Sequence, residues 1–595
     1  MDRLTKVMAA AAAAVLALAG CTGEPDGEPT PASSSTPGGE VHVAESNTFS
    51  SFNPQTAGGN TDINNRIAYA THSGFNYVDN NLEIVPLKEF GTYSKISDDP
   101  LKVKYTVNED VAWSDGAPVD ADDMILAWAA GSGRFDDAHT DPGGNRDGTR
   151  YFDYAGSTEA LALTGVPEVG DENRSVTLTY ARPYADWETA FGSLTDGGGI
   201  GMPAHVVAQG AGLADEAALT DLLTGTPAGN PADPAPVNPE LRAVADYWNS
   251  AFATDALPAD PSLYLSSGPF IVRSIDPGRS LTLVRNDDYH WGPEPELDEI
   301  MVRFIADPAA QVQALKDGSV DIISPQPDAG TLDQLTGMGN INLHQGNQLA
   351  YDHLDLNFSG VFADRNVREA FLKTVPRPEI VEATVARLQP DAVPLDSEVF
   401  LPDQAAYENA AATNGSAEFA DVDITAARDL LAGAAPEVRI LYNRDNANRA
   451  QAFALIAESA ARAGFTVVDG GLPAGEWEAA LGLQTHDAAI FGWTSSGVGI
   501  SGVPQVFRTG AASNYNGFSS PEADALMDEL LTETDARKQD ELQTGIDRLI
   551  WADRYGLPLY QLPALQASAD TIEHVEYMPN QTGPWWNFWE WAVAR

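Results

Sequence analysis

Cysteine is almost absent from this chain, because Cys21 is the only one in 595 residues. A single thiol cannot form an intramolecular disulfide, so the folded body must be stabilised by its core and not by cross-links. Basic residues are also scarce, with 34 Lys and Arg against 86 Asp and Glu and a formal net charge of −52. Such a negative charge repels phosphate groups, and we therefore expect no nucleic-acid partner.

Long apolar runs are missing as well, and the one apolar stretch near the start is short. Arg3 and Lys6 precede apolar residues at 7–19. This stretch is shorter than the roughly 20 residues of a membrane-spanning helix but typical of a secretory signal. We therefore predict that residues 1–20 are a cleavable signal peptide.

The residues around Cys21 resemble a bacterial lipobox. The sequence LAGC at 18–21 places small residues before the cysteine, which predicts that Cys21 becomes the lipidated first residue of the mature protein. An ordinary buried or surface cysteine is the alternative. Residues 22–40 are mainly Pro, Ser, Gly, Thr and acid, so we predict a disordered tether over 21–40. The lipid would anchor the body to the outer face of the cell membrane.

The remaining residues predict a body in which helices and strands alternate, without an internal repeat. We expect a helix at 66–75, a hairpin within 77–87 and a helix capped by Asp120. A second hairpin turns at 276–278 and is followed by a strand at 299–305. Similar alternation continues toward the C-terminus, which indicates an α/β fold.

Six separate stretches carry a more specific signal, because they match the signatures of one family in the same order. The family is the extracytoplasmic solute-binding proteins of ABC importers, in the oligopeptide and dipeptide group called solute-binding protein family 5. The stretches that resemble it are WSDG at 113–116 with PVDADD at 118–123, GPF at 268–270 with RNDDYHW at 285–291, KDGSVD at 316–321, LNF at 356–358 with VREAF at 367–371, NYN at 514–516 with AD at 523–524, and PLY at 558–560.

The resemblance implies an α/β, two-lobed periplasmic-binding-protein fold of type II, in the large peptide-binding class. Lobe I would comprise 41–305 with insertions and an extra subdomain, lobe II 306–560, and residues 561–595 would return to lobe I. The hinged lobes of this family close on a solute without altering it. We therefore expect no enzyme activity, no catalytic residue, no cofactor and no metal. The sequence contains neither G-x-S-x-G nor H-E-x-x-H, which agrees with this expectation.

The resemblance also implies a set of ligand-binding residues. Trp477 and Trp493 match two ligand-facing tryptophans of the peptide-binding members, although packing in the core is the alternative for both. Those members pair the peptide's amino terminus with an Asp three residues after the tryptophan, where this chain has Ser496. Either another acid substitutes, or the solute lacks a free amine. The other implied residues are Thr494, Tyr442, Asn443, Thr61, Asp62 and Asn64.

The function implied is capture of an oligopeptide or dipeptide and its delivery to the permease subunits of an ABC transporter, by a monomer. Alternatives are a non-peptide solute, or a family-5-like lipoprotein with a role in envelope glycolipid assembly or sensing. The sequence WWNFWEW at 585–591 could form a stacking platform for sugars. We predict instead that it docks as a terminal segment on its lobe.

Overall fold

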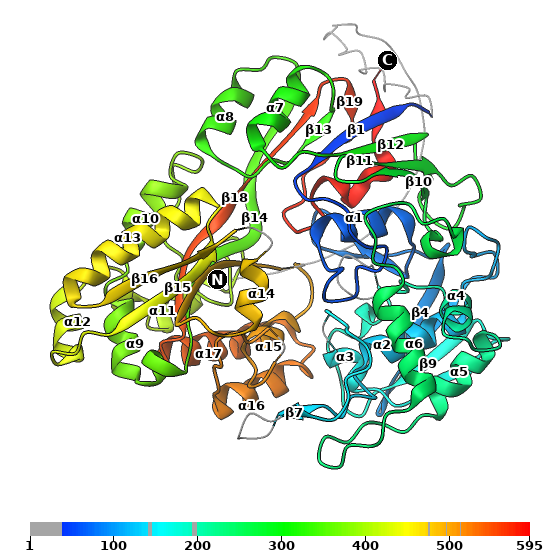
Figure 1. Cartoon of the computed structure of the whole chain (residues 1–595), viewed down its shortest axis with the longest axis horizontal. Helices are drawn as coiled ribbons and strands as arrows, with labels where there is room; N and C mark the ends of the chain where they lie inside the picture. The colour runs from blue at the N-terminus through cyan, green and yellow to red at the C-terminus, as the bar shows by residue number, and fades with distance from the viewer. Residues whose placement is uncertain are drawn as a thin grey trace, which may run out of the picture. The chain divides into compact units, whose positions relative to one another are not determined.

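The computed structural model describes residues 38–140, 146–156, 158–192, 199–473, 476–495, 497–511 and 513–594 (Figure 1). The predicted signal peptide, Cys21 and nearly all of the predicted tether lie outside these ranges, as does Ser496. Within the described ranges, no helix combines the length and the apolar character needed to cross a bilayer.

One large sheet runs through the described residues. Its ten strands, in spatial order, are β10 (Phe270–Asp276), β11 (Ser280–Arg285), β12 (Glu299–Phe304), β1 (Glu40–Glu45), β13 (Ile322–Ile323), β18 (Gly556–Ala569), β14 (Ile341–Leu356), β17 (Ala488–Thr494), β15 (Glu437–Asn443) and β16 (Thr466–Leu472). Strand β1 is parallel to β12 and β13, and β15 is parallel to β16 and β17. The long strands β14 and β18 pair antiparallel and connect these two parts of the sheet (Figure 1).

Smaller sheets accompany the large one in the described part of the chain. A four-stranded sheet has the order β4 (Gly91–Asp98), β5 (Leu101–Val107), β9 (Ser175–Thr179) and β8 (Glu168–Gly170). The two-stranded ribbons are β2 (Asn76–Val78) with β3 (Ile84–Pro86), β6 (His139–Thr140) with β7 (Arg146–Asp147), and β19 (Ile572–Glu573) with β20 (Ala592–Val593).

Helices follow most of the strands and cover the sheets. The α-helices are α1 (Asp62–Thr71), α2 (Ala121–Gly131), α3 (Glu159–Ala162), α4 (Ala204–Gly210), α5 (Glu216–Gly225), α6 (Pro239–Ser250), α7 (Pro308–Lys316), α8 (Ala329–Thr336), α9 (Arg365–Leu372), α10 (Arg377–Thr384), α11 (Tyr407–Thr413), α12 (Ile424–Leu431), α13 (Ala447–Ala463), α14 (Trp477–Gly482), α15 (Gly502–Phe507), α16 (Pro521–Leu530) and α17 (Ala536–Ala552). The 3₁₀ segments are η1 (Trp187–Thr189), η3 (Pro261–Tyr264), η4 (Gly360–Ala363), η5 (Ser416–Phe419) and η6 (Gly583–Glu590).

Two hydrophobic cores account for most of the buried apolar side chains. The first joins residues of 41–302 to apolar side chains of α15–α17 and of the C-terminal segment. The second is built on β14, β15, β17 and β18 and on the helices α9, α10, α12 and α13. This burial supplies the stability that the chain cannot obtain from disulfides. The lobe boundaries given by the sequence stay a prediction.

The aromatic C-terminal segment is packed into the first core, as predicted. Trp585 and Trp591 are fully buried, whereas Trp589 is only partly buried. The indole Nε1 of Trp585 donates a 2.8 Å hydrogen bond to Glu45 of β1, which ties the C-terminal segment to the first strand. Packing in the core therefore accounts for most of this segment's rings.

Several elements predicted from local patterns are confirmed, and one has wrong bounds. Asp120 caps α2 in a full capping box, and both predicted hairpins form. The helix predicted at 66–75 is α1, which begins four residues earlier because the Thr61 hydroxyl accepts a hydrogen bond from the Asn64 N–H at 3.4 Å. The polar residues that we assigned to a loop are therefore the first turn of a helix.

Candidate solute-binding site

Trp493 lies at the end of β17, between two other rings. Its ring centroid is 5.9 Å from that of Tyr515 at an interplanar angle of 7°, and 6.0 Å from that of His353 at 12°. Phe491, two residues earlier on the same strand, packs edge-on at 5.3 Å. Alternate residues of a strand point to the same face, which explains why Phe491 and Trp493 share this aromatic cluster.

Two ring nitrogens of this cluster lack a partner among the described residues. The Nε1 of Trp493 is a buried donor without an acceptor, and the Nε2 of His353 is likewise unpaired. The other ring nitrogen of His353, Nδ1, lies 2.6 Å from the Asp355 carboxylate. Since a buried unpaired donor costs roughly 1–3 kcal/mol, an acceptor that reaches Trp493 Nε1 would be favoured.

Trp477, the first residue of α14, adjoins a buried ion pair. The guanidinium of Arg449 lies 5.6 Å from the Trp477 ring centroid and donates to the carboxylate of Asp352, with the closest contact at 2.9 Å. The Tyr560 hydroxyl donates to the same carboxylate at 3.2 Å. Gly492 leaves room for this pair, because a Cβ there would lie 2.9 Å from Asp352 Oδ1. Both carboxylate oxygens of Asp352 therefore already accept hydrogen bonds within the protein.

Tyr442 and Asn443 lie near the end of β15, and the structure separates Tyr442 from the tryptophans. Its ring is 4% exposed, stacks on Phe453 at 4.9 Å and belongs to the second core, whereas Leu441 packs beside Trp477 and Trp493. Burial, followed by a hydrogen bond with Asp469, raises the pKa of Tyr442 to about 12. Asn443 accepts a hydrogen bond from the Asp445 N–H at 3.0 Å.

Thr61, Asp62 and Asn64 lie at the start of α1, where their side chains hydrogen-bond to residues close by in the sequence. Thr61 caps the helix, and Asp62 accepts a 2.8 Å hydrogen bond from the Asn47 side chain. Asn64 is 1% exposed, donates to Ser50 and Gly59, and accepts from the Ser50 N–H. These contacts give each residue a structural role, and contact with a solute stays a prediction for all three.

Thr494 and Ser496 follow Trp493 on the chain. Thr494 is exposed, ends β17 and pairs in register with Ala350 of β14. Ser496 lies outside the described residues, so its predicted role stays a prediction. The structure thus brings Trp477, Trp493 and Thr494 to one end of the sheet, apart from the buried Tyr442 ring.

A carboxylate from a distant segment reaches the loop that follows Ser496. Asp186 accepts hydrogen bonds from the N–H groups of Ile500 at 2.9 Å and Ser501 at 3.0 Å. Burial raises the pKa of the Asp186 carboxyl. Close by, Arg182 and Asp528 form an ion pair at 3.3 Å. These contacts join residues that the sequence assigns to lobe I and lobe II.

Sequence reasoning missed a group of buried acids next to the aromatic cluster. Both carboxyl oxygens of Glu398 are buried and lack a hydrogen-bond partner in the described residues, and burial raises its pKa well above the usual range. Asp355 and Asp547 raise the pKa of Glu398 further by repulsion. The pattern HLD at 353–355, with acid and imidazole two residues apart on a strand, was the signal that could have placed Asp355 beside His353.

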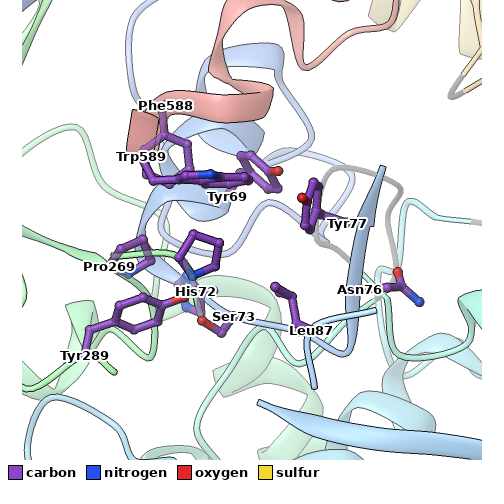
Figure 2. A pocket seen from close by; sticks show the side chains of 12 residues that line it. Tyr69, His72, Ser73, Asn76, Tyr77, Leu87, Pro269, Tyr289, Phe588 and Trp589 are labelled. Carbon is purple, nitrogen blue, oxygen red and sulfur yellow. The ribbon is translucent and has the colours of Figure 1, made fainter. Parts of the chain in front are cut away.

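A small pocket with a cavity volume of about 30 Å³ lies elsewhere in the structure, between α1, the residues after it, Pro269, Tyr289 and η6 (Figure 2). None of the predicted solute-binding residues lines it. The described residues contain no group of three or more His, Cys, Asp or Glu side chains placed to hold a metal ion.

Comparisons with solved structures agree with the predicted fold class. The periplasmic EDTA-binding protein EppA superimposes with a TM-score of 0.75 at 21% identity, over 95% of this chain and 98% of that one. At this identity the likeness concerns the fold, and it confirms the predicted two-lobed α/β periplasmic-binding-protein class.

The family follows from the sequence comparisons. The model of bacterial extracellular solute-binding proteins, family 5, matches residues 88–515, and the chain belongs to this family. The oligopeptide-binding protein OppA of Mycobacterium bovis is 28% identical over 487 residues, which cover 80% of this chain and 71% of OppA. An uncharacterized lipoprotein of Mycobacterium tuberculosis is 27% identical over 559 residues, 91% of each chain.

Proposed function

We propose that this protein is the solute-binding lipoprotein of an ABC importer. It captures an oligopeptide or dipeptide between lobes at 41–305 and 306–560 and presents it to the membrane permease for transport. Membership of family 5 and the similarity to an oligopeptide-binding protein support this role. Lipid on Cys21 holds the protein, as a monomer, at the outer face of the cell membrane, and it needs no catalytic residue and no cofactor.

The unpaired indole N–H of Trp493 is the observation that carries the proposal. It lies near the end of a strand, in a stack with Tyr515 and His353, and because it is covered in this structure, a peptide carbonyl oxygen can accept its hydrogen bond only after the surrounding residues move apart. Backbone groups of an extended peptide are well suited to such a position beside a sheet. Trp477 and the exposed Thr494 extend the proposed contact surface.

The acid that pairs with a peptide amine elsewhere in the family is replaced here by Ser496. Asp352 is engaged by Arg449, and Asp186 by two backbone N–H groups. We therefore propose that a free α-amino group contributes little to affinity. A charge-assisted pair would otherwise make the solute's amine a main determinant of binding.

Native mass spectrometry of the mature protein, purified without refolding, tests the solute class. A series of short peptide masses supports the proposal, whereas a sugar or lipid mass contradicts it and favours the glycolipid or other non-peptide alternative. Titration with a tripeptide and its N-acetylated form then tests the role of the amine. We expect the two affinities to agree within about threefold. A charged hydrogen bond to the amine would be worth roughly 1.5–3 kcal/mol, so its loss on acetylation would weaken binding more than about tenfold.

A matched pair of variants tests the site. Trp493→Leu should weaken peptide binding at least about tenfold, because it removes both a stacked ring and a donor. Tyr264→Leu removes a half-buried ring packed 5.9 Å from Phe52 and should leave affinity unchanged. Equal affinities for the two variants would remove Trp493 from the site.

A further inference from the structure

Five of the twelve residues that line the pocket in Figure 2 are Tyr, Phe or Trp, and they come from four separate segments of the chain. Its rings are those of Tyr69, Tyr77, Tyr289, Phe588 and Trp589. Tyr77 and Trp589 are only partly buried, so their rings are accessible from the cavity. The predicted solute-binding residues contribute nothing to these walls, which makes this a second candidate site.

The rings enclose the cavity from different directions. The planes of Tyr77 and Trp589 meet at 76° with centroids 5.1 Å apart, and those of Tyr69 and Trp589 at 49°. Figure 2 shows Trp589 and Tyr69 along one side, Tyr77 on a second side, and Pro269 and Tyr289 across from Tyr77. These rings contact one another, and a ring face that borders the cavity carries partial negative charge, which attracts a cation placed against it.

Two of the three tyrosine hydroxyls on the walls are already occupied within the protein. Tyr69 donates to the backbone oxygen of Trp586 at 3.0 Å, and Tyr289 is hydrogen-bonded to the side chain of Ser73. A ligand in the cavity therefore meets ring surface rather than these hydroxyl groups. This favours a guest that interacts with π faces over one that needs many hydrogen bonds.

The charged groups that act on the pocket residue Tyr77 are carboxylates. Neither Lys nor Arg occurs among the lining residues, and burial lowers the pKa of His72 to about 4, which keeps its imidazole neutral at pH 7. Glu590 and Asp79 lie close enough to Tyr77 to raise its pKa by repulsion, in addition to burial. An anionic guest would be repelled by these carboxylates, and a cation would be attracted.

We propose that this pocket is a binding site for an organic cation that carries an alkylated ammonium group. The methyl groups of such a head bury apolar surface against Leu87 and the prolines, while its charge interacts with the rings and with the surrounding carboxylates. None of the predicted solute-binding residues lines this pocket. A titration with an organic cation therefore tests this proposal, and a titration with a peptide tests the proposed function separately.

Choline and its neutral isostere 3,3-dimethylbutan-1-ol test the proposal on the unmodified mature protein. The two probes have the same shape and differ in charge, so calorimetric titration separates cation binding from apolar burial. Choline should bind at least about fivefold more tightly, which is the effect of one cation–π contact that stays partly exposed to water. Equal affinities for choline and the neutral alcohol, or no binding of choline, would overturn the proposal.

Variants then place the probe in the pocket. Trp589→Leu and Tyr77→Leu should each lower choline affinity about fivefold or more, whereas Tyr77→Phe keeps the ring and should retain it. Trp187→Leu is the matched control, because Trp187 is also half-buried and has Lys95 5.2 Å from its ring centroid, but does not line the pocket. Circular dichroism verifies that each variant is folded. Unchanged affinity in folded Trp589→Leu protein contradicts the proposal.

Discussion

The carboxylate of Asp186 accepts a hydrogen bond from the N–H of Ser501, 315 residues further along the chain. The same carboxylate accepts from Ile500, and the N–H of Ala185 donates to the Leu531 oxygen at 2.8 Å. Because these segments belong to different predicted lobes, the contact would be made when the lobes close and lost when they open.

Asp186→Ala should therefore shift the protein toward an open form. Loss of two hydrogen bonds to a charged acceptor removes about 1.5–3 kcal/mol from the closed form, which lowers its population relative to the open form roughly tenfold or more. Small-angle scattering without solute should show a larger radius of gyration. Asp333→Ala, at an exposed ion pair, is the control, and identical scattering for all three proteins would contradict the prediction.

Arg449 and Asp352 give a prediction about stability. Their side chains are 13% and 1% exposed, so Arg449→Met leaves a buried carboxylate without its partner. We expect the free energy of unfolding to fall by about 3–5 kcal/mol, measured by chemical denaturation. Arg387→Met breaks an ion pair whose partners are 71% and 73% exposed, and should cost less than about 1 kcal/mol. Similar losses in the two variants would contradict the assignment of a buried pair.

Glu398 gives a prediction about pH. Its pKa in the folded protein is raised by burial and then by Asp355 and Asp547, while the pKa in the unfolded chain is about 4.3. The folded state thus binds more protons above pH 4, and this contribution to stability is lost as pH rises through the folded pKa. Burial similarly raises the pKa of Asp547 to about 6.

The free energy of unfolding should therefore decline between pH 4 and neutrality, and Glu398→Gln should make that decline shallower and the protein more stable at pH 7.5. Denaturant titrations across this range measure both effects. Glu408→Gln, at an exposed position on α11, should leave the pH profile as it is. If Glu398→Gln leaves the pH dependence of the unfolding free energy unchanged, the pKa of Glu398 is the same in the folded and unfolded states and the prediction is wrong.

Cys21 gives a prediction about anchoring. The wild-type protein, expressed in a bacterium that lipidates its lipoproteins, should partition into the detergent phase of a Triton X-114 extract. Cys21→Ser removes the acylated sulfur and should move the protein to the aqueous phase. Thr22→Ser, next to it, serves as the control. Detergent partitioning that survives the Cys21 change would contradict lipidation at this residue.

Patterns local in the sequence predicted local structure well. The cap at Asp120 and the two hairpins depend on neighbouring residues, and ordered matches to family signatures carried the fold class. The start of α1 was misplaced because Thr61, Asp62 and Asn64 suit both turns and helix N-termini. Period-2 alternation along β15 could have put Tyr442 on the face opposite Leu441, but a strand's pattern does not tell which face meets solute.

Contacts between distant residues could not be predicted from one sequence. The pairing of Asp352 with Arg449 and the approach of Asp186 to Ser501 depend on how the sheet and loops are assembled. The same holds for the pocket in Figure 2, whose walls come from α1, Tyr289 and η6. No local periodicity joins segments more than 500 residues apart.

The hydrogen bond between Glu45 and Trp585 has a consequence for biosynthesis. The two residues are separated by 540 positions, so a ribosome has made nearly the whole polypeptide before the partner of Glu45 exists. Until then the first strand lacks the indole that covers its acidic side chain, and contacts of such long range form late in folding. The first core is therefore completed only after the C-terminal segment has been synthesised.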